Sequence, residues 1–409
     1  MELNDVNFLV MPTIAMPMKI LHVSHGGLPD VRVEKEALTL RDFGYDISFV
    51  GSKFNGLFYE RNPFSRIINI PFSLMAKAGI HPWWGALRRK LLSVVTEMKP
   101  DLIHAHDIIA GSLVASISAE LNIPFIYDDH EYWSKETAYG YPVVSICKVS
   151  VGNFEVKCSV KNKILLVPRN LKYIARMAVC TKVYKEWESK VVAMASAVIT
   201  VSEEIAKEHR KLNSEVIVIP NYPFLKEMVE NGGKARKAPL KIVYIGKILG
   251  MHPPYRDLRG FINIMKDLER CEVVIVGDND IKTAYPLISL GVIPHRELIK
   301  RISVYHVGLL PWAPHPFHRY CNPNKAYEYA AAGLHVIVPS SLTPVKTSLG
   351  NLCETFENYD GLRELLIYYS DYPEEAVEKG KKILALARKM LTWDNVKWQL
   401  LSIYEKMLT

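Results

Sequence analysis

The chain has 409 residues, of which 49% are hydrophobic and 23% charged, and its formal net charge is +8. This balance is typical of a folded globular protein and excludes a largely disordered one. The length exceeds what one ordinary core occupies, so two or three domains are expected. The six cysteines contain no C-x-x-C pair, which indicates inert thiols in a reducing compartment.

The N-terminal segment lacks the signature of an export signal. Glu2 and Asp5 stand where a signal peptide carries basic residues. No apolar run approaches the roughly 18 residues that a membrane span needs. We therefore expect a cytoplasmic protein, and we expect residues 1–17 to be a loose extension.

Two series of strands alternate with helical segments. Short apolar runs of this kind, separated by helices, predict βαβ units and parallel sheets. The pattern restarts after residue 240, so the fold class is α/β with two tandem sheets. The expected strands are 19–25, 46–51, 101–106, 124–130, 197–202 and 215–221 in the first series, and 240–246, 271–278, 305–311 and 334–339 in the second.

Domain boundaries follow from this series. The N-terminal domain is expected over 18–225, with a basic helical insertion at about 140–195, and the C-terminal domain over 238–392. The polar, glycine-rich stretch 226–241 between the two series is the expected linker. Residues 393–409 form an amphipathic helix that we expect to pack back on the N-terminal domain. Because ligands bind at the carboxyl ends of parallel strands, two facing sheets predict a cleft between the domains.

Glycines follow the first strand in "SHGGLPDVR". Gly26 and Gly27 either let a phosphate or hydroxyl approach the backbone before the helix at 31, or form a plain tight turn. The stretch is not G-x-G-x-x-G, and no acidic residue is placed for a dinucleotide ribose. This argues against a nicotinamide cofactor.

Histidines and carboxylates gather at two further strand ends, in "HAHD" and "YDDHEYW". The pleat of the strand is expected to separate the two histidines of H-A-H, and no strong metal spacing is present. We therefore predict that these side chains bind no metal and instead hydrogen-bond a hydroxylated substrate. For any single histidine of the group, a purely structural role is the alternative. The cluster comprises His104, His106, Asp107, Asp128, Asp129, His130 and Glu131.

Basic groups mark the second sheet. Lys247 follows a strand-end glycine, and Arg256 and Arg259 come shortly after; such groups clamp phosphates. In "CNPNKAYEYAAAG" a helix begins near Asn324 and Lys325, where a lysine opposes the helix dipole unless an anion is bound. Glu328, one turn further, suits a ribose diol. The alternative is a surface ion pair of about 0.3–0.5 kcal/mol.

These blocks together resemble the retaining, nucleotide-sugar-dependent glycosyltransferases of family four, which have the GT-B fold. "MKILHVSHGG", "KPDLIHAHD", "IPFIYDDHEYW", "ASAVITVSEEIAKEH" and "NPNKAYEYAAAGLHVIVP" match the family's blocks in order over most of residues 18–340. The resemblance implies two Rossmann-like domains facing each other across a cleft. It also implies that the nucleotide sugar binds mainly to the C-terminal domain.

The family's site residues map onto this chain one by one. Glu328 matches the second Glu of the Glu-x7-Glu motif, which holds the ribose. Lys247 and Arg259 match the basic pair at the diphosphate, with Arg256 as a rival for Arg259. His130 matches the histidine near the donor sugar, and Gly26 and Gly27 the glycine loop. The first Glu of the motif is replaced by Tyr320, and His335 stands where proline is usual, so the identity of the donor sugar is open.

The resemblance implies transfer of a sugar from a UDP- or GDP-sugar with retention and without metal or cofactor. Lys247, Arg259 and the helix start at Asn324–Lys325 would stabilise the leaving diphosphate, His130 would orient the sugar, and Asp107 would touch the acceptor. A nucleotide-sugar epimerase of the same fold and a non-enzymatic sugar-binding protein are the alternatives. A nucleic-acid binder is disfavoured, since no recognition motif is present.

The acceptor is less defined. Residues 148–190 hold ten Lys/Arg and three Glu, and "HPWWGALRRKLLSVV" at 81–95 places two tryptophans beside basic residues. Such segments predict peripheral membrane contact and a lipid-linked acceptor. A solvated basic edge with core-facing tryptophans explains them equally well.

Overall fold

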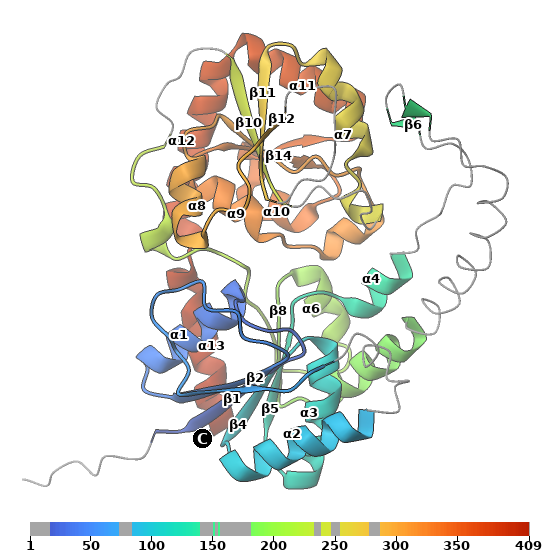
Figure 1. Ribbon diagram of the computed structural model, residues 1–409, viewed down its shortest axis with the longest axis vertical. Helices are drawn as coiled ribbons and strands as arrows, with labels where there is room; N and C mark the ends of the chain where they lie inside the picture. The colour runs from blue at the N-terminus through green and yellow to red at the C-terminus, as the bar shows by residue number, and fades with distance from the viewer. Residues whose placement is uncertain are drawn as a thin grey trace, which may run out of the picture.

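The computed structural model describes residues 17–72, 84–139, 150–151, 154–155, 181–232, 239–246, 254–277 and 287–408. Two α/β domains lie one above the other, each built on a parallel sheet with helices on both faces (Figure 1). The α/β, two-domain class expected from the sequence is confirmed.

The N-terminal sheet has seven parallel strands in the order β3-β2-β1-β4-β5-β8-β9. The order reverses at β1 and β4, so their carboxyl ends flank the topological switch point where ligands bind in such sheets. The strands are β1 (Lys19–Ser24), β2 (Asp46–Gly51), β3 (Arg66–Asn69), β4 (Leu102–His106), β5 (Phe125–Asp129), β8 (Ala197–Thr200) and β9 (Val216–Val218).

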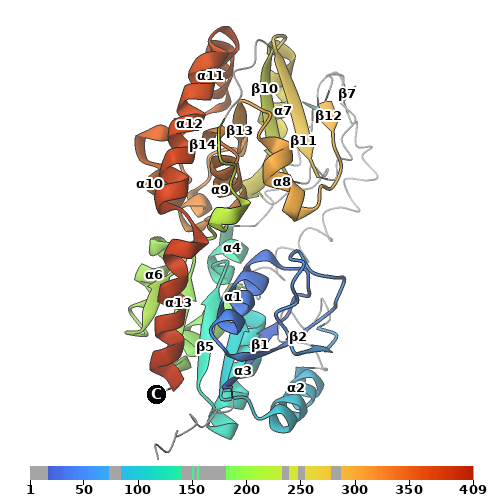
Figure 2. The same cartoon turned by 90° about the vertical axis from the view of Figure 1, so that its left-hand side faces the viewer.

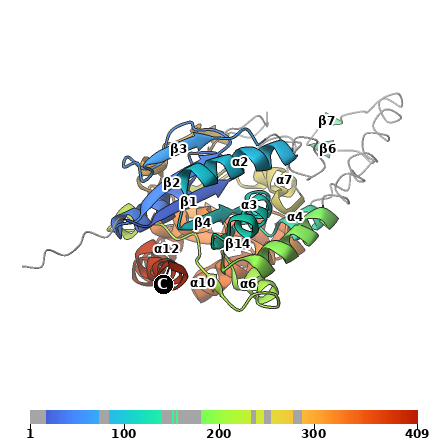
Figure 3. The ribbon, with the colours of Figure 1, turned by 90° about the horizontal axis from the view of Figure 1, so that it is seen from below.

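Helices cover both faces of this sheet. One face packs on α2, α3 and the helical residues 181–194, and the other packs on α1 and α13 (Figure 3). Both faces of every central strand are therefore buried, which explains the near-continuous apolar runs in the sequence. The helices are α1 (Val31–Asp42), α2 (Trp84–Met98), α3 (Asp107–Leu121), α4 (Trp133–Tyr139), α6 (Glu203–His209) and α13 (Trp393–Leu408).

The C-terminal sheet repeats the architecture with six parallel strands in the order β12-β11-β10-β13-β14-β15. Its strands are β10 (Leu240–Ile245), β11 (Cys271–Val276), β12 (Leu287–Ser289), β13 (Val307–Leu309), β14 (His335–Pro339) and β15 (Glu354–Phe356). Its helices are α7 (Arg259–Ile264), α8 (His295–Ile302), α9 (Asn324–Ala331), α10 (Thr343–Leu349), α11 (Tyr359–Asp371) and α12 (Pro373–Met390).

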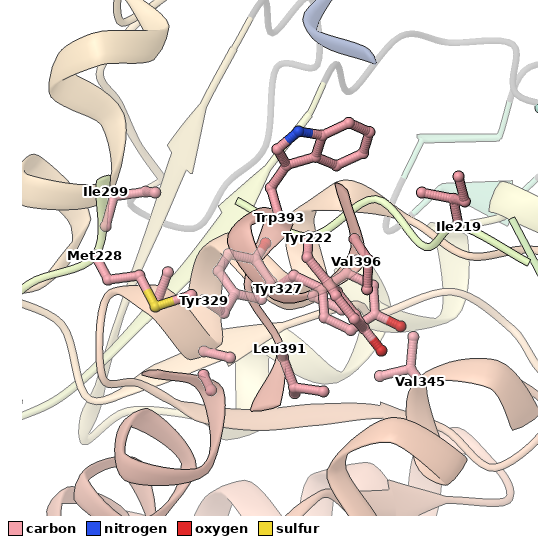
Figure 4. Packing of buried hydrophobic residues seen from close by; sticks show 14 of the residues in the cluster. Ile219, Tyr222, Met228, Ile299, Tyr327, Tyr329, Val345, Leu391, Trp393 and Val396 are labelled. Carbon is pink, nitrogen blue, oxygen red and sulfur yellow. The ribbon is translucent and has the colours of Figure 1, made fainter. Parts of the chain in front are cut away.

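The chain passes between the domains twice. It rises after β9 and returns where α12 leads into α13, which runs down beside α1 (Figure 2). Trp393 at the start of α13 donates from Nε1 to Thr39 Oγ1 of α1 at 2.8 Å. One apolar cluster spans this junction, with Trp393 near Tyr222 of the first crossing and Tyr327 and Tyr329 of α9 (Figure 4).

Within the two large sheets, three strands escaped the sequence-based expectation: β3, β12 and β15. All three are only three or four residues long and lie at or next to a sheet edge, so their residues are partly exposed and lack a clear apolar run. Most of the expected insertion at about 140–195 lies outside the described residues, as do residues 1–16. Within the described part of it, β6 (Ser150–Val151) pairs with β7 (Phe154–Glu155), and residues 181–194 are helical.

Among the described residues, no helix combines the length and apolar character needed to cross a bilayer. Within α2, Trp84 stacks on Trp187 at 4.9 Å between ring centroids, and Arg88 hydrogen-bonds Ser116. Trp84 thus packs on a neighbouring helix, while Arg89 and Lys90 are exposed.

Candidate active-site cleft

A cavity of about 300 Å³ lies between the carboxyl ends of the two sheets. Both domains and the crossing between them contribute to its wall. The lining side chains include Asp30, Arg32, His130, Glu131, Tyr132, Asn221, Tyr255, Arg256, Trp312, Tyr320, Asn324 and Lys325. Aromatic rings, cations and amides thus surround one space, which suits a polar ligand with a ring and negative charge.

His130 follows β5 and reaches the cavity from the N-terminal side. Its Nε2 lies 2.6 Å from Asp128 Oδ2, and its backbone N–H donates to Asp107 Oδ1 at 3.3 Å. Burial opposes protonation of His130, but the carboxylates of Asp128 and Asp107 outweigh burial and raise its pKa to about 10. The cleft therefore presents a positively charged imidazolium in a fixed orientation.

Asp128 is held by a second partner, Arg32 in the first turn of α1. The guanidinium donates from Nε to Oδ2 and from Nη2 to Oδ1, both at 2.9 Å, and from Nη1 to the Ile219 carbonyl at 2.8 Å. Burial alone would raise the pKa of Asp128, but Arg32 and His130 hold it well below its usual range. Arg32, Asp128 and His130 thus form one fully ionised chain of contacts that fixes the imidazolium.

Asp107 begins α3 with a φ of +63°, in the left-handed region that non-glycine residues rarely adopt. Its side chain is 15% exposed, and desolvation raises the pKa of its carboxyl to about 7 despite the nearby His130. Strained backbone of this kind concentrates at functional sites. Asp107 contacts His130 but does not line the cavity.

The glycine loop serves the local fold. A Cβ on Gly27 would lie 2.3 Å from the Lys53 carbonyl oxygen, so only glycine allows this close approach between the loops after β1 and β2. Neither Gly26 nor Gly27 lines the cavity.

The two histidines of H-A-H are not separated. His104 and His106 are residues i and i+2 of β4, so they share one face of the strand, and their rings stack at 4.3 Å. The expectation that the pleat separates them is wrong. Both are fully buried beneath the cleft, as are Asp128 and Asp129, while His130 and Glu131 line it. Asp129 is paired with His209 at 2.7 Å.

The C-terminal wall centres on the start of α9. Its N-cap, Pro323, offers no side-chain acceptor, so amides of the first turn face the cavity that Asn324 and Lys325 line. Lys325 Nζ lies 5.4 Å above the Tyr244 ring and 5.5 Å from the Trp312 ring. Burial, aided by Arg256, lowers the pKa of Lys325 to about 8. A bound polyanion would favour its charged form.

Of the two candidate arginines, Arg256 lies in the cavity wall, against Tyr255 and Trp312 and 3.6 Å from Glu131. Arg259 begins α7, is largely exposed, and donates to Asp257, with its Nη2 at 2.6 Å from Oδ2. Lys247 lies outside the described residues.

Glu328 lies beside the cavity rather than in it. It faces a space of about 10 Å³ that shares Asn221 and Asn324 with the main cavity, and its Oε1 is 3.5 Å from His295 Nε2. A ribose does not fit there unless His295 or the domains move. Tyr320 does line the cavity, and its ring packs edge-on against Tyr132 at 5.2 Å. His335 is buried in β14, away from the cleft.

Sequence reasoning missed the contributions of Asp30, Arg32 and Asn221. Asp30 caps α1 by accepting from the Arg32 and Val33 amides at 3.0 and 3.1 Å. Arg32 is a cation in the first turn of a helix, the same unfavourable position relative to the helix dipole that drew attention to Lys325. The segment "PDVR" therefore shows this unfavourable placement of a cation in the sequence itself. Nothing in the sequence places Asn221 beside Arg32.

The fold and this cleft define a two-domain glycosyltransferase architecture of the GT-B type. Sucrose-phosphate synthase from Thermosynechococcus elongatus is similar in structure, with a TM-score of 0.67 at 13% identity over 95% of this chain and 99% of that one. Anabaena HepE in complex with UDP-glucose follows, with a TM-score of 0.60 at 13% identity over 95% and 100%. A glycosyltransferase from Rickettsia africae gives 0.59 at 11% identity over 96% and 99%.

Residues 31–222 match the family model described as Glycosyltransferase Family 4. The match covers most of the N-terminal domain, and with the fold it supports the resemblance of the chain to family-4 glycosyltransferases. A search of curated proteins found no match.

Proposed function

We propose that the chain transfers a sugar from a nucleoside-diphosphate sugar to an acceptor hydroxyl, with retention of anomeric configuration. One observation carries the proposal. Arg256, Lys325 and the uncapped start of α9 form one wall of the cleft, and the charged His130 forms the opposite wall. A diphosphate fits the first wall, and the sugar attached to it then faces the second.

The reaction breaks the bond between the anomeric carbon and the diphosphate oxygen while the acceptor oxygen bonds to the same carbon. Negative charge develops on the leaving diphosphate, and Arg256, Lys325 and the α9 amides stabilise it. The acceptor proton passes to a phosphate oxygen on the same face. We propose this same-face route because, among the residues that the structure describes, no carboxylate lines the cavity at a place that suits a covalent intermediate: Asp30 caps α1, and Glu131 is paired with Arg256.

His130 orients the sugar in this proposal. Its Nδ1 lies 4.0 Å from Asp107 and its Nε2 is held by Asp128, so the ring cannot turn freely. Asp107, whose pKa burial raises to about 7, accepts from the His130 amide and does not itself line the cavity. Closure of the domains on the ligand would exclude water, which otherwise competes with the acceptor.

The proposed donor is a UDP-sugar, with a GDP-sugar as the alternative. HepE, which shares the fold, is described in complex with UDP-glucose, UDP and glucose. Glu328 would accept the ribose hydroxyls once the space in front of it opens. Tyr320, in place of the family's first Glu, would remove one hydrogen bond to the sugar ring and thereby select the donor.

The acceptor is proposed to be a glycan, a small molecule or a lipid-linked sugar reached at the cytoplasmic face of a membrane. Among the described residues, membrane contact is supported by exposed basic side chains, whereas Trp84 packs on Trp187. These are Arg89 and Lys90 of α2 and Lys182, Lys185 and Lys190 of the basic segment. Sedimentation with anionic liposomes decides this part: a chain that stays in the supernatant at low salt contradicts membrane contact.

The test of the proposed function is a thermal-shift screen of the chain against UDP, GDP, ADP and their sugars. A ligand in excess over its Kd stabilises by RT ln(1 + [L]/Kd), so the right nucleotide raises Tm and the others do not. The Lys325→Ala variant should lose the shift. Product analysis by mass spectrometry, with and without acceptor sugars, then separates transfer from epimerisation, which yields an isomeric nucleotide sugar without acceptor. No shift with any nucleotide contradicts the proposal.

A further inference from the structure

Four fully buried side chains converge below the cleft, inside the N-terminal domain. His22 comes from β1, His104 and His106 come from the neighbouring β4, and Glu36 comes from α1. His22 and His104 are direct partners in the parallel pairing of the two strands. One ligand atom of each of the four residues lies within 4.8 Å of the others.

Within this group His22 Nδ1 and His106 Nε2 lie 2.9 Å apart and can share a hydrogen bond, and four other polar atoms are left without one. Nε2 of His22, Nε2 of His104 and both carboxylate oxygens of Glu36 are buried and make no hydrogen bond. Each unsatisfied buried polar atom costs about 1–3 kcal/mol, so four in one place call for a bound species. The nearest cation, Arg32, has its Nε 3.2 Å from Glu36 Oε1 but is already committed to Asp128.

We propose that His22, Glu36, His104 and His106 bind one divalent transition-metal cation of the zinc class. Three imidazole nitrogens and one carboxylate oxygen are a donor set that Zn²⁺ accepts in tetrahedral geometry. Ligand atoms around Zn²⁺ at about 2.0–2.1 Å lie roughly 3.4 Å apart, so the side chains would close inward by about 1 Å. Glu36 Oε2 lies 3.7 Å from His104 Nε2, which is already close to the separation of roughly 3.4 Å expected between two zinc ligands.

Neighbouring groups already orient the ligands. Tyr404 of α13 lies 2.5 Å from His104 Nδ1, which engages that nitrogen and leaves Nε2 free to face the site. Metal-binding histidines generally have such a partner on the second ring nitrogen. Arg32 occupies the region of Glu36 Oε1, which leaves Oε2 for the cation. The second cluster with ligand-like spacing, His106, Asp128 and His130, contains no buried polar atom without a hydrogen bond and is not proposed.

The site is structural and not part of the transfer chemistry. Four protein ligands complete a tetrahedron and leave no open position for a substrate, as in structural zinc sites. None of the four residues lines the cleft. The cation would join β1, β4 and α1 directly, and α13 through Tyr404. It would also fix His106, whose Nδ1 lies 3.2 Å from His130 Nε2. The inference therefore stands whether or not the proposed transfer is correct.

Metal content of the untagged full-length chain is the direct test. After expression with zinc supplementation, plasma mass spectrometry should find about one zinc per chain. After removal by a chelator, Co²⁺ should restore one equivalent with the visible absorption bands of a tetrahedral site. Less than about 0.1 equivalent of any transition metal, with no Co²⁺ spectrum and no change of Tm on adding Zn²⁺, overturns the proposal in favour of buried waters.

Two variants test whether a loss of bound zinc results from misfolding rather than from the loss of a ligand. Glu36→Gln keeps the shape of the side chain but removes the anionic ligand, so it should lose bound zinc and the Tm increase caused by zinc. His335→Gln is the matched control, because His335 is also fully buried with unpartnered ring nitrogens but lies in β14 of the other domain. Equal zinc in Glu36→Gln and the wild-type chain, or equal zinc loss in both variants, contradicts the assignment.

Discussion

The two walls of the cleft are built on opposite principles. The N-terminal wall rests on a dry layer in which Arg32, Asp128 and the imidazoles satisfy or face one another, and only His130 reaches the cavity. The C-terminal wall consists of an uncapped helix start and two cations, Lys325 and Arg256, set among aromatic rings. Arg32 and Asp128 hold the first wall in place without a ligand in the cleft, whereas the second wall has donors and charge that a ligand would satisfy.

Because of this difference, we expect mutations in the first wall to change the stability of the fold and mutations in the second wall to change ligand binding. Charges in the N-terminal layer have fixed protein partners, so changing one destabilises the fold. Charges in the C-terminal wall have few partners within the described residues, so changing one should weaken ligand binding and leave the fold intact. A variant that lacks one side chain of either wall can therefore be compared with a variant at a matched position elsewhere.

The largest effect is expected from Asp128→Asn. This change leaves the guanidinium of Arg32 buried without its bidentate carboxylate, and loss of one partner of a buried pair typically costs about 3–5 kcal/mol. Urea unfolding followed by circular dichroism measures it. Asp42→Asn is the control, since Asp42 pairs with Arg61 on the surface and should change stability by less than about 1 kcal/mol. Equal losses would contradict the distinction between the walls.

Arg256→Ala should lower kcat/KM about 100-fold without lowering Tm, because a preorganised cation at the leaving group is lost. Arg259→Ala is the counterpart from the neighbouring turn, where the side chain is exposed and paired with Asp257. We expect it to change kcat/KM less than about threefold. A larger effect from Arg259 would assign the diphosphate contact to it, as the family resemblance implies.

Donor affinity should depend on pH through Lys325. Its pKa in the free cleft is about 8, lowered by burial, and a bound diphosphate favours the charged form. Below that pH Lys325 is already charged, so the affinity for the donor should not change with pH. Above it, binding must take up a proton, so affinity falls up to about tenfold per pH unit. Calorimetry in buffers of different ionisation enthalpy detects the proton. Lys325→Arg, which stays charged, should abolish the slope; an unchanged slope would show that another group takes up the proton.

The smallest effect is expected from Tyr404→Phe. It removes the contact with His104 and should lower the free energy of unfolding by about 1 kcal/mol. Trp398→Phe on the same helix, where the side chain is 57% exposed, is the control and should stay within about 0.5 kcal/mol of wild type. A Tyr404→Phe protein as stable as the control would show that the α13 contact adds nothing to the N-terminal layer.

The features that could be predicted from the sequence are those encoded by residues close together in the chain. Apolar runs located the central strands, and "NPNKAYEYAAAG" located α9 with Lys325 at the cleft. It did not locate the short edge strands β3, β12 and β15, whose residues are too few and too exposed to show a period. It also did not place Glu36 against His22, because that contact depends on how α1 packs on the sheet rather than on spacing in the chain.

Two site predictions depended on distances that only the fold defines. Glu328 lies one turn inside α9 as expected, yet its orientation beside His295 follows from how α8 packs on α9. Arg256 and Arg259 are three positions apart, and the turn of chain between them directs one into the cleft and the other toward solvent.

The contact between His104 and Tyr404 joins positions 300 residues apart. Because α13 covers the face of the first sheet that carries α1, the domain that the ribosome makes first lacks part of its core until α13 emerges. The second domain, by contrast, has its complete sheet before that point. We therefore expect the first domain to stay in a partly open state during synthesis, with the apolar face of α1 in need of temporary shielding, and to close only after α13 has been translated.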